Sequence, residues 1–269
     1  MRSARLRDKG TLRMFVFVGD ESNVTQSRQA RFFIYGGLII AADKASEATK
    51  RITSVRTKYG FPQDAEFKFD SRSRPADMSN AQFLQAKNEV LTACAELEVR
   101  FMAYAVHHGI ATKQRSDLWL WALNTLLCQF DLFLQREKSY GICLVDRFEN
   151  DMSLLRRIHQ QGVDPEFWGG RLPHKLENVW CYGTINIGTT HAASMVDIVL
   201  GAFRYCVNEM VRKNAPLALY KKVRPLMLCE PGNPAKVKEW GLFLRPKGIK
   251  AAYYKQEYDA LLQHLESLE

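Results

Sequence analysis

Acidic residues beside apolar segments are the feature of this sequence that could do chemistry. They are Asp20 with Glu21, Glu66, Asp146 and Asp197. A carboxylate next to a buried segment is unfavourable unless a cation or hydrogen bonds compensate it. Because these positions lie far apart in the chain, shared cations would account for all of them. The pattern therefore predicts that the folded chain gathers these residues around metal ions.

The residue types indicate the metal and the reaction. Oxygen ligands without interspersed Cys or His favour Mg²⁺ or Mn²⁺ over zinc. The ligands that we predict for two such ions are Asp20, Glu66, Asp146 and Asp197. One ion would activate a water, and the other would stabilise the leaving oxygen of a phosphodiester. Glu21 is the next candidate ligand. Lys68, two residues after Glu66, would stabilise a phosphate or the developing negative charge.

Each position also has a purely structural interpretation. Acidic residues that follow an apolar run can simply open a turn. Glu66 could pair with Lys68 on an exposed strand. Asp197 could belong to a polar helical stripe that includes Arg204, seven residues later. The coincidence of four such positions in one chain favours the metal site over these separate explanations.

Strands and helices alternate along the chain in an order that could bring the acidic residues together. Segments rich in β-branched and aromatic residues predict strands over residues 14–20, 31–42, 98–106, 141–146 and 179–187. The first two would form an antiparallel hairpin. Helical patterns predict helices over residues 43–59, 79–97, 113–135, 152–161, 190–212 and 255–268. This order is typical of an α/β fold, with a mixed sheet flanked by helices, in which carboxylates at neighbouring strand ends converge.

Length and composition indicate one globular domain. The chain has 269 residues, of which 46% are hydrophobic and 25% are charged. We divide it into a basic N-terminal arm (residues 1–13) and a single domain (residues 14–269), whose last part, from about residue 225, is a C-terminal extension. The apolar runs are too short to span a membrane, and the N-terminus lacks the apolar core of a secretory signal.

The cysteines and the charge predict a cytoplasmic protein with an anionic partner. The six cysteines stand far apart without a Cys-x-x-Cys pair, which indicates buried free thiols in a reducing compartment. The formal net charge of +9 favours nucleic acid, DNA or RNA, as the partner. The basic residues that could line a nucleic-acid groove are Arg72, Arg74, Arg147, Arg156 and Arg157. A solvated basic surface is the alternative reading of these arginines.

At the acidic positions the chain resembles the bacterial and phage family known as domain of unknown function 3800. That family begins with a strand running into an Asp-Glu-Ser-Gly motif, matched here by Asp-Glu-Ser-Asn at residues 20–23. A Glu-x-Lys element follows at residues 66–68, and a strand ending in Asp follows at residues 145–146. The last motif, a helix reading roughly Leu-Gln-Leu-Ala-Asp-Leu-Val-Ala-Gly, is matched by residues 193–201. Gly-Gly-Leu-Ile-Ile at residues 36–40 also fits the second strand of the family.

The resemblance implies a ribonuclease-H-like fold and metal-dependent cleavage of phosphodiester bonds. Some members of the family look associated with mobile elements or phage defence, so the resemblance also suggests such a setting. Asn23 replaces the usual glycine, but asparagine also adopts the left-handed backbone conformation that such a turn needs. Val196 replaces the usual alanine before Asp197, which changes the packing and leaves the carboxylate in place.

The sequence therefore predicts a Mg²⁺- or Mn²⁺-dependent nuclease that uses a two-metal-ion mechanism. Two alternatives stay open. The chain could be a nucleic-acid-binding protein with the same fold and no turnover, or a metal-dependent hydrolase of a nucleotide-like small molecule. The sequence does not decide between DNA and RNA, or between a monomer, a homodimer and a complex with another protein.

Overall fold

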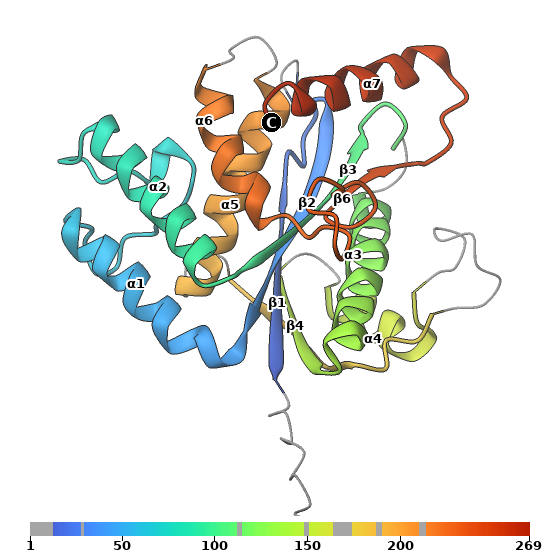
Figure 1. The fold of residues 1–269 in the computed structure, drawn as a ribbon, viewed down its shortest axis with the longest axis horizontal. Helices are drawn as coiled ribbons and strands as arrows, with labels where there is room; N and C mark the ends of the chain where they lie inside the picture. The colour runs from blue at the N-terminus through green and yellow to red at the C-terminus, as the bar shows by residue number, and fades with distance from the viewer. Residues whose placement is uncertain are drawn as a thin grey trace, which may run out of the picture.

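The computed structural model describes residues 13–27, 30–111, 115–147, 151–163, 174–186, 190–209 and 214–269. These residues form one mixed β-sheet with helices packed on both of its faces (Figure 1). The α/β architecture predicted from the sequence, a mixed sheet flanked by helices, is confirmed.

The strands of the described residues form a single six-stranded sheet. They are β1 (Met14–Ser22), β2 (Phe32–Ala41), β3 (Arg100–His107), β4 (Tyr140–Asp146), β5 (Val179–Ile185) and β6 (Leu242–Arg245). Their order in the sheet is β5-β4-β1-β2-β3-β6. β2 pairs antiparallel with β1 and β3, whereas β4 with β1, β5 with β4 and β6 with β3 are parallel pairs. Because β2 alone runs against the others, the carboxyl ends of the other five strands lie at the same end of the sheet.

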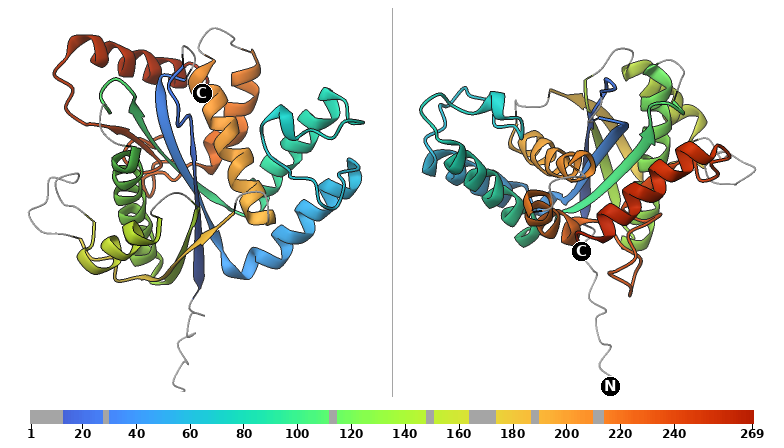
Figure 2. Two further views of the ribbon diagram at one scale, coloured as in Figure 1. Left: turned by 180° about the vertical axis from the view of Figure 1, so that it is seen from behind. Right: turned by 90° about the horizontal axis from the view of Figure 1, so that it is seen from above.

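Helices cover both faces of this sheet (Figure 2). The helices that pack on one face are α1 (Ala45–Lys58), α2 (Asn80–Glu96), α5 (His191–Asn208), α6 (Asn214–Val223) and α7 (Ala252–Glu266). Those on the other face are α3 (Arg115–Glu137) and α4 (Asp151–Gln161). Ser79 is the N-cap of α2: its Oγ accepts from the Gln82 N–H at 3.2 Å, and Gln82 Oε1 accepts from the Ser79 N–H at 3.0 Å. None of the helices in the described residues is long and apolar enough to cross a membrane.

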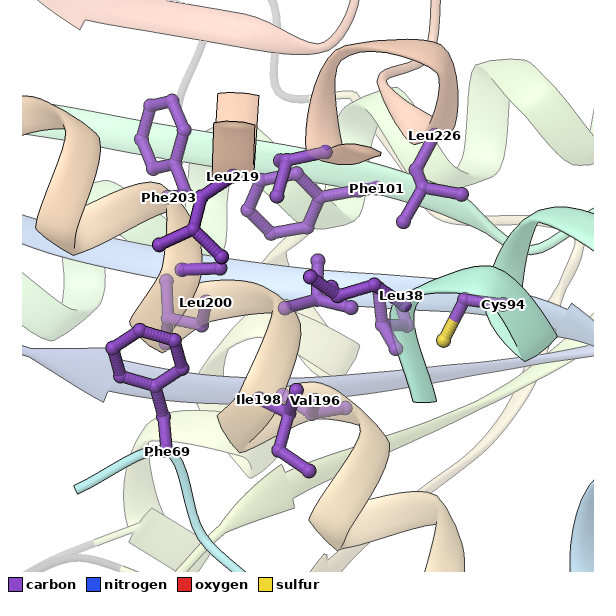
Figure 3. Close-up of a cluster of buried hydrophobic side chains, with 14 of the residues drawn as sticks. Leu38, Phe69, Cys94, Phe101, Val196, Ile198, Leu200, Phe203, Leu219 and Leu226 are labelled. Atoms are coloured by element: carbon purple, nitrogen blue, oxygen red, sulfur yellow. The ribbon is translucent and has the colours of Figure 1, made fainter. Parts of the chain in front are cut away.

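The apolar contact between α5 and the sheet fixes the position of Asp197. Leu200 and Phe203 of α5 lie against the middle of the sheet next to Phe101 of β3 (Figure 3). Gly36 of β2 lies under this contact, and a Cβ on it would be 2.7 Å from Leu200 Cδ1. The absence of that side chain lets α5 lie close to the sheet, which sets the height of Asp197 above it.

β1 is enclosed by apolar side chains from both faces. On the α3 side, the rings of Phe17 and Phe130 lie 5.5 Å apart, and Val18 belongs to the core on the α5 side. Phe17 to Asp20 are buried, and Asp20 is the first charged side chain of the strand. The apolar run and the acidic residue that ends it therefore have the relation that the sequence indicated.

The fold differs from the predicted elements at three places. Helix α6 has no predicted counterpart, because Pro216 interrupts the helical pattern; the proline lies in the first turn, where it is tolerated. Residues 65–69 form no strand. The C-terminal extension supplies β6, which pairs with β3, and α7, so it completes the sheet.

Candidate metal site

A cleft of about 540 Å³ opens at the carboxyl ends of β1 and β4. Its walls come from residues 20–24, from the irregular segment 65–70 and the neighbouring Arg72, from the ends of β4 and β5, and from the middle of α5. Its acidic side chains are Asp20, Glu21, Asp70, Asp146 and Asp197. Its basic side chains are Lys68, Arg72, Arg147 and Arg204. Carboxylates and cationic groups in one hollow can bind a cation and an anion next to each other.

Three of these carboxylates form an acidic cluster, which we define as Asp20, Glu21 and Asp146. Each offers an oxygen that lies within 4.8 Å of the others. The register of the sheet brings them together, because Gly19 of β1 pairs with Val145 of β4 and the next residue on each strand is acidic. Ionised carboxylates this close repel one another unless a cation lies among them.

Asp20 is the buried member of the acidic cluster, with 7% of its surface exposed. Burial, followed by the negative charges of Glu21, Asp197 and Asp146, raises the pKa of Asp20 well above its usual value. The Glu21 backbone N–H donates to Asp20 Oδ1 at 2.8 Å and opposes this rise in part. No cationic side chain of the described residues forms an ion pair with Asp20. A divalent cation would compensate the ionised carboxylate, and the all-oxygen cluster fits Mg²⁺ or Mn²⁺.

Asp197 lines the same cleft from α5. Its Oδ2 accepts a hydrogen bond from the Phe69 N–H at 2.5 Å. Burial raises the pKa of Asp197, and the Phe69 amide, Lys68 and Arg204 act against this rise. Gly201, one turn after Asp197, permits the contact, because a Cβ there would lie 2.3 Å from Phe69 Cβ. The Asp-x-x-x-Gly spacing of α5 thus has a packing reason.

Glu66 and Lys68 lie on the irregular segment, and Lys68 is the one that lines the cleft. Lys68 Nζ is 2.9 Å from Glu66 Oε2, and 56% of the Glu66 side chain is exposed. Partial burial disfavours the Lys68 ammonium, but Glu66 and the more distant Asp197 and Asp146 raise its pKa overall. The Glu66 carboxylate lies outside the acidic cluster. Its role as a metal ligand stays a prediction.

Lys87 of α2 also holds the irregular segment in place. The lysine is buried, with 8% of its surface exposed, and burial lowers its pKa. Its Nζ donates to the Phe69 carbonyl at 3.1 Å and lies 4.3 and 4.5 Å from the ring centres of Phe69 and Phe83. The Phe69 carbonyl is therefore bound by α2, while its amide is bound by Asp197 of α5.

Asn23 shapes the wall of the cleft after β1. Its φ of 58° is left-handed, as expected for a residue that replaces glycine. Its Nδ2 donates to Phe32 O and to Asn208 Oδ1, both at 3.2 Å. His108 Nε2 is hydrogen-bonded to the Asn23 carbonyl at 2.9 Å. These bonds tie the end of β1 to the start of β2, the end of α5 and the end of β3.

Two polar residues of the cleft, Asp70 and Asn186, are absent from the predicted site. Asn186 follows β5, the parallel neighbour of β4, so the strand-end rule that indicated Asp146 would also have indicated Asn186. Asp70 accepts from Arg72 Nε and Nη2 at 3.0 and 2.9 Å, which lowers the pKa of Asp70. It lies on the irregular segment, where no sequence period sets the direction of a side chain.

The predicted basic residues are only partly in the cleft. Arg72 and Arg147 line it, whereas Arg74 donates to a carbonyl of its own loop. Arg204 lines it too, although the sequence indicated this residue only as a partner for Asp197. The cleft therefore draws its positive charge from three separate elements rather than from one basic run.

No family model matches this chain, and no curated protein matches it. The resemblance to the domain of unknown function 3800 family thus depends on the short motifs at residues 20–23, 66–68, 145–146 and 193–201.

Proposed function

We propose that the protein is a Mg²⁺- or Mn²⁺-dependent nuclease with a ribonuclease-H-like fold, which hydrolyses phosphodiester bonds of DNA or RNA. The observation that carries this proposal is the environment of Asp20. The carboxylate is buried, has no ion-pair partner among the described residues, and has oxygens of Glu21 and Asp146 within 4.8 Å. An ionised carboxylate in the position of Asp20 is unfavourable without a cation.

The chain supplies donors for the metal ions at two places in the cleft. Asp20, Glu21 and Asp146 would hold one ion, and Asp197 would contribute to a second from α5. Bound there, the ions supply an activated water and stabilise the leaving oxygen. The contact from the Phe69 N–H fixes the orientation of the Asp197 carboxylate before any ion binds.

Basic side chains of the same cleft suit the negative charge of a phosphodiester. Lys68, Arg147 and Arg204 line the cleft, and Glu66 helps to keep the Lys68 ammonium protonated. In our proposal Lys68 holds a non-bridging oxygen of the scissile phosphate, and the two arginines position the neighbouring phosphates. Without these cations, the carboxylates of the cleft would repel the substrate.

The order of the strands supports the ribonuclease-H-like part of the proposal. An antiparallel β1-β2-β3 unit is followed by β4 and β5, which add in parallel on the other side of β1. Acidic residues then stand at the ends of the adjacent strands β1 and β4 and on the later helix α5, in the order of the family motifs. The net charge of +9 favours nucleic acid over a nucleotide-like small molecule as the substrate.

The test is cleavage of labelled single- and double-stranded DNA and RNA in Mg²⁺ or Mn²⁺. Asp20→Asn, Asp146→Asn and Asp197→Asn each remove a charge at constant size, and we expect cleavage to fall by about 100-fold or more. Asp70→Asn removes a carboxylate of the same cleft that is already bonded to Arg72, so it is the matched control and should stay active. Loss of cleavage in Glu66→Gln would show that Glu66 takes part in the reaction, and full cleavage would show that it does not.

Stability in the presence and absence of metal gives a second readout. In EDTA, Asp20→Asn should keep or raise the melting temperature, because it relieves repulsion within the acidic cluster. Mn²⁺ should raise the melting temperature of the wild type and of Asp70→Asn, but not that of Asp20→Asn. Equal cleavage by wild type and all Asn variants would remove the carboxylates from the mechanism. Nucleic-acid binding without metal-dependent cleavage in any variant would favour a binding protein with this fold.

A further inference from the structure

A basic surface that the proposed metal site does not use extends from the residues before β6, over the β6–α7 connection, to the first turn of α7. Residues 236–255 contain six basic residues and one acidic residue. We define the C-terminal basic surface by its exposed members Lys238, Lys247, Lys250, Tyr253 and Lys255. Three of them, Lys238, Lys247 and Lys255, line one cleft of about 340 Å³ together with Glu239 and Asp259. These side chains are therefore close enough to contact one ligand.

The positive charge of this surface is only partly neutralised by its neighbours. Lys247 Nζ and Lys255 Nζ have acidic oxygens at 2.9 and 3.3 Å, and both lysine side chains are more than half exposed. Lys238 and Lys250 have no ion-pair partner within the part of the chain that the structure describes. No acidic residue lies in the first turn of α7. Exposed ion pairs are weak, so an anionic partner can recruit all four lysines.

Tyr253 presents an exposed aromatic ring at the start of α7, three residues after Lys250 and outside the cleft of the other three lysines. Its surface is 62% exposed, and its ring lies 5.3 Å from that of Tyr254. Tyr254 is anchored in turn, because its hydroxyl donates to the Gly109 carbonyl at 3.0 Å. Cationic side chains with an exposed aromatic ring nearby are typical of surfaces that bind single strands, where bases stack on the ring and phosphates meet the cations. Paired bases in a duplex are not available for such stacking.

The C-terminal basic surface and the metal-site cleft lie at the same end of the sheet. β6 and β1 run in the same direction and are separated by β2 and β3, so their ends are roughly 14 Å apart across the sheet. Hydrogen bonds connect the two places. His108 binds the carbonyl of Asn23 in the cleft wall, and the next residue, Gly109, accepts from Tyr254 of α7. Figure 1 shows α7 lying across this end of the sheet beside the end of β3.

We propose that the C-terminal basic surface binds the single-stranded continuation of a nucleic acid whose scissile phosphate lies in the metal-site cleft. The proposal rests on the nuclease function for its choice of ligand. The lysines contact phosphates, and Tyr253 stacks on an unpaired base. An oligonucleotide that only fills the cleft does not reach this surface, whereas a longer strand does. In this proposal the C-terminal extension selects single strands over duplexes.

The test is equilibrium binding of labelled oligonucleotides by fluorescence anisotropy, with Mg²⁺ and in an Asp20→Asn background that removes turnover. The ligands are single strands of about four and about twenty nucleotides and a duplex of the longer one. One variant combines Lys238→Gln, Lys250→Gln and Lys255→Gln. Its matched control combines Lys50→Gln, Lys138→Gln and Lys175→Gln, three exposed lysines at the opposite end of the sheet. Tyr253→Ala and Tyr253→Phe test the stacking.

We expect the surface variant, but not its control, to bind the long single strand at least about 10-fold more weakly. The slope of log affinity against log salt should fall by about 2, since each lost phosphate contact removes about 0.7. Affinity for the short strand should not change. Tyr253→Ala should weaken binding of the long single strand by about 10-fold and leave the duplex unaffected, whereas Tyr253→Phe should bind as tightly as the parent protein.

Several results would overturn this proposal. They are equal losses in the surface and control variants, equal losses for short and long strands, or a loss from Tyr253→Ala that is as large for the duplex. Absence of nucleic-acid binding by the parent protein would have the same effect. Competition by polyglutamate as strong as that by the oligonucleotide would indicate an acidic protein partner instead. Surface-dependent binding together with no cleavage by the wild type would reject the nuclease and keep this inference, and the reverse pattern would do the opposite.

Discussion

His107, the last residue of β3, is a buried side chain whose neutral form the fold favours. Only 4% of its surface is exposed, and its Nδ1 accepts from the Gly109 N–H at 3.0 Å. Burial lowers the pKa of His107; Glu257 opposes this effect, and Arg31 and His108 add to it. A proton on Nδ1 would also displace the hydrogen bond from Gly109. The residue therefore couples the protonation state of the protein to its stability.

The direction of this pH dependence follows from the pKa of His107 in the folded and in the unfolded protein. The unfolded histidine titrates near pH 6.5, and the folded one binds its proton less tightly. The contribution to stability is therefore fully present above about pH 6.5, and it is lost as the pH falls below that value toward the lower pKa of the folded state. Each tenfold difference in proton affinity corresponds to about 1.4 kcal/mol.

We expect the free energy of unfolding to fall more steeply between pH 7 and pH 5.5 in the wild type than in His107→Asn. The asparagine does not titrate, and its side-chain oxygen can still accept from Gly109. Urea unfolding at several pH values measures the difference. His159→Asn, on the exposed side of α4, controls for the loss of an imidazole elsewhere. Parallel pH profiles for the wild type and His107→Asn would show that His107 does not carry this dependence.

Single residues differ in how far the sequence predicts them. Asp20 and Asp197 each interrupt a regular apolar pattern, and both line the cleft. Glu66 stands between apolar residues on a segment without a period, which sets no direction for its side chain, and that side chain lies in solvent beside Lys68. Lys87 looks like any helical lysine in the sequence. Its partner, the carbonyl of an irregular segment 18 residues earlier, is set only by tertiary packing.

At the scale of elements, the irregular segment 65–70 depends on the two helices between which it lies. α2 binds the carbonyl of Phe69 through Lys87, and α5 binds its amide through Asp197. Gly201 lets the segment approach α5 closely. Arg56 of α1 also donates to the Ala65 carbonyl, and Ser73 is hydrogen-bonded to the Lys68 backbone. The segment, which forms no helix or strand, is thus held by side chains, and it carries Lys68 into the cleft. Changes at this contact should affect activity more than they affect the fold.

Gly201→Ala tests this arrangement. The new Cβ would lie 2.3 Å from Phe69 Cβ, and overpacking of this kind costs about 1–3 kcal/mol, against a gain of about 1 kcal/mol from the better helix former. We expect a small loss of stability and a loss of cleavage of about 10-fold or more, because Phe69 moves away from Asp197. The melting temperature measures the change in stability, and the cleavage rate measures the change in activity. Gly248→Ala, where a Cβ meets open space, is the control. A Gly201→Ala protein that is both fully active and more stable would contradict the proposed contact.

The elements themselves were predictable where the pattern is long. β1, β2, β4, α2, α3 and α5 follow from apolar runs and helical periods of seven residues or more. α6 was not predicted, because Pro216 interrupts its helical pattern. β6 has four residues, which are too few to show an alternation of apolar and polar residues. The pairing of β6 with β3 joins residues more than a hundred positions apart, and no local pattern specifies such a register.

At the scale of the whole molecule, the sheet brings both proposed sites to one end of the fold. Because five strands run in the same direction, their carboxyl ends bring the acidic cluster and the C-terminal basic surface to the same side of the fold. The acidic residues at the strand ends of the sequence predicted the acidic cluster. From the sequence we expected the last residues to be an extension, whereas β6 is part of the sheet and α7 packs onto it.

The C-terminal extension should therefore be required for folding. Tyr258 of α7 joins it to the sheet, since its hydroxyl accepts from the His107 N–H at 2.8 Å and donates to the Arg245 carbonyl. Tyr258→Phe leaves these two buried backbone groups without that partner, and we expect it to cost about 1–3 kcal/mol, or about 2–4 °C for each kcal/mol. Tyr253→Phe, which removes an exposed hydroxyl from the same helix, should leave the melting temperature unchanged.

Deletion of residues 242–269 is the larger form of the same experiment. It removes β6 and α7, exposes the outer edge of β3 and uncovers the apolar side chains that α7 buries, so we expect no cooperative thermal transition by calorimetry. A truncated protein that unfolds in one sharp transition at the wild-type temperature would mean that the extension is an appendage. In that case the placement of the basic surface relative to the proposed metal site would lose its structural basis. A single transition in the full-length protein and none in the truncated one would instead make the two sites parts of one folding unit.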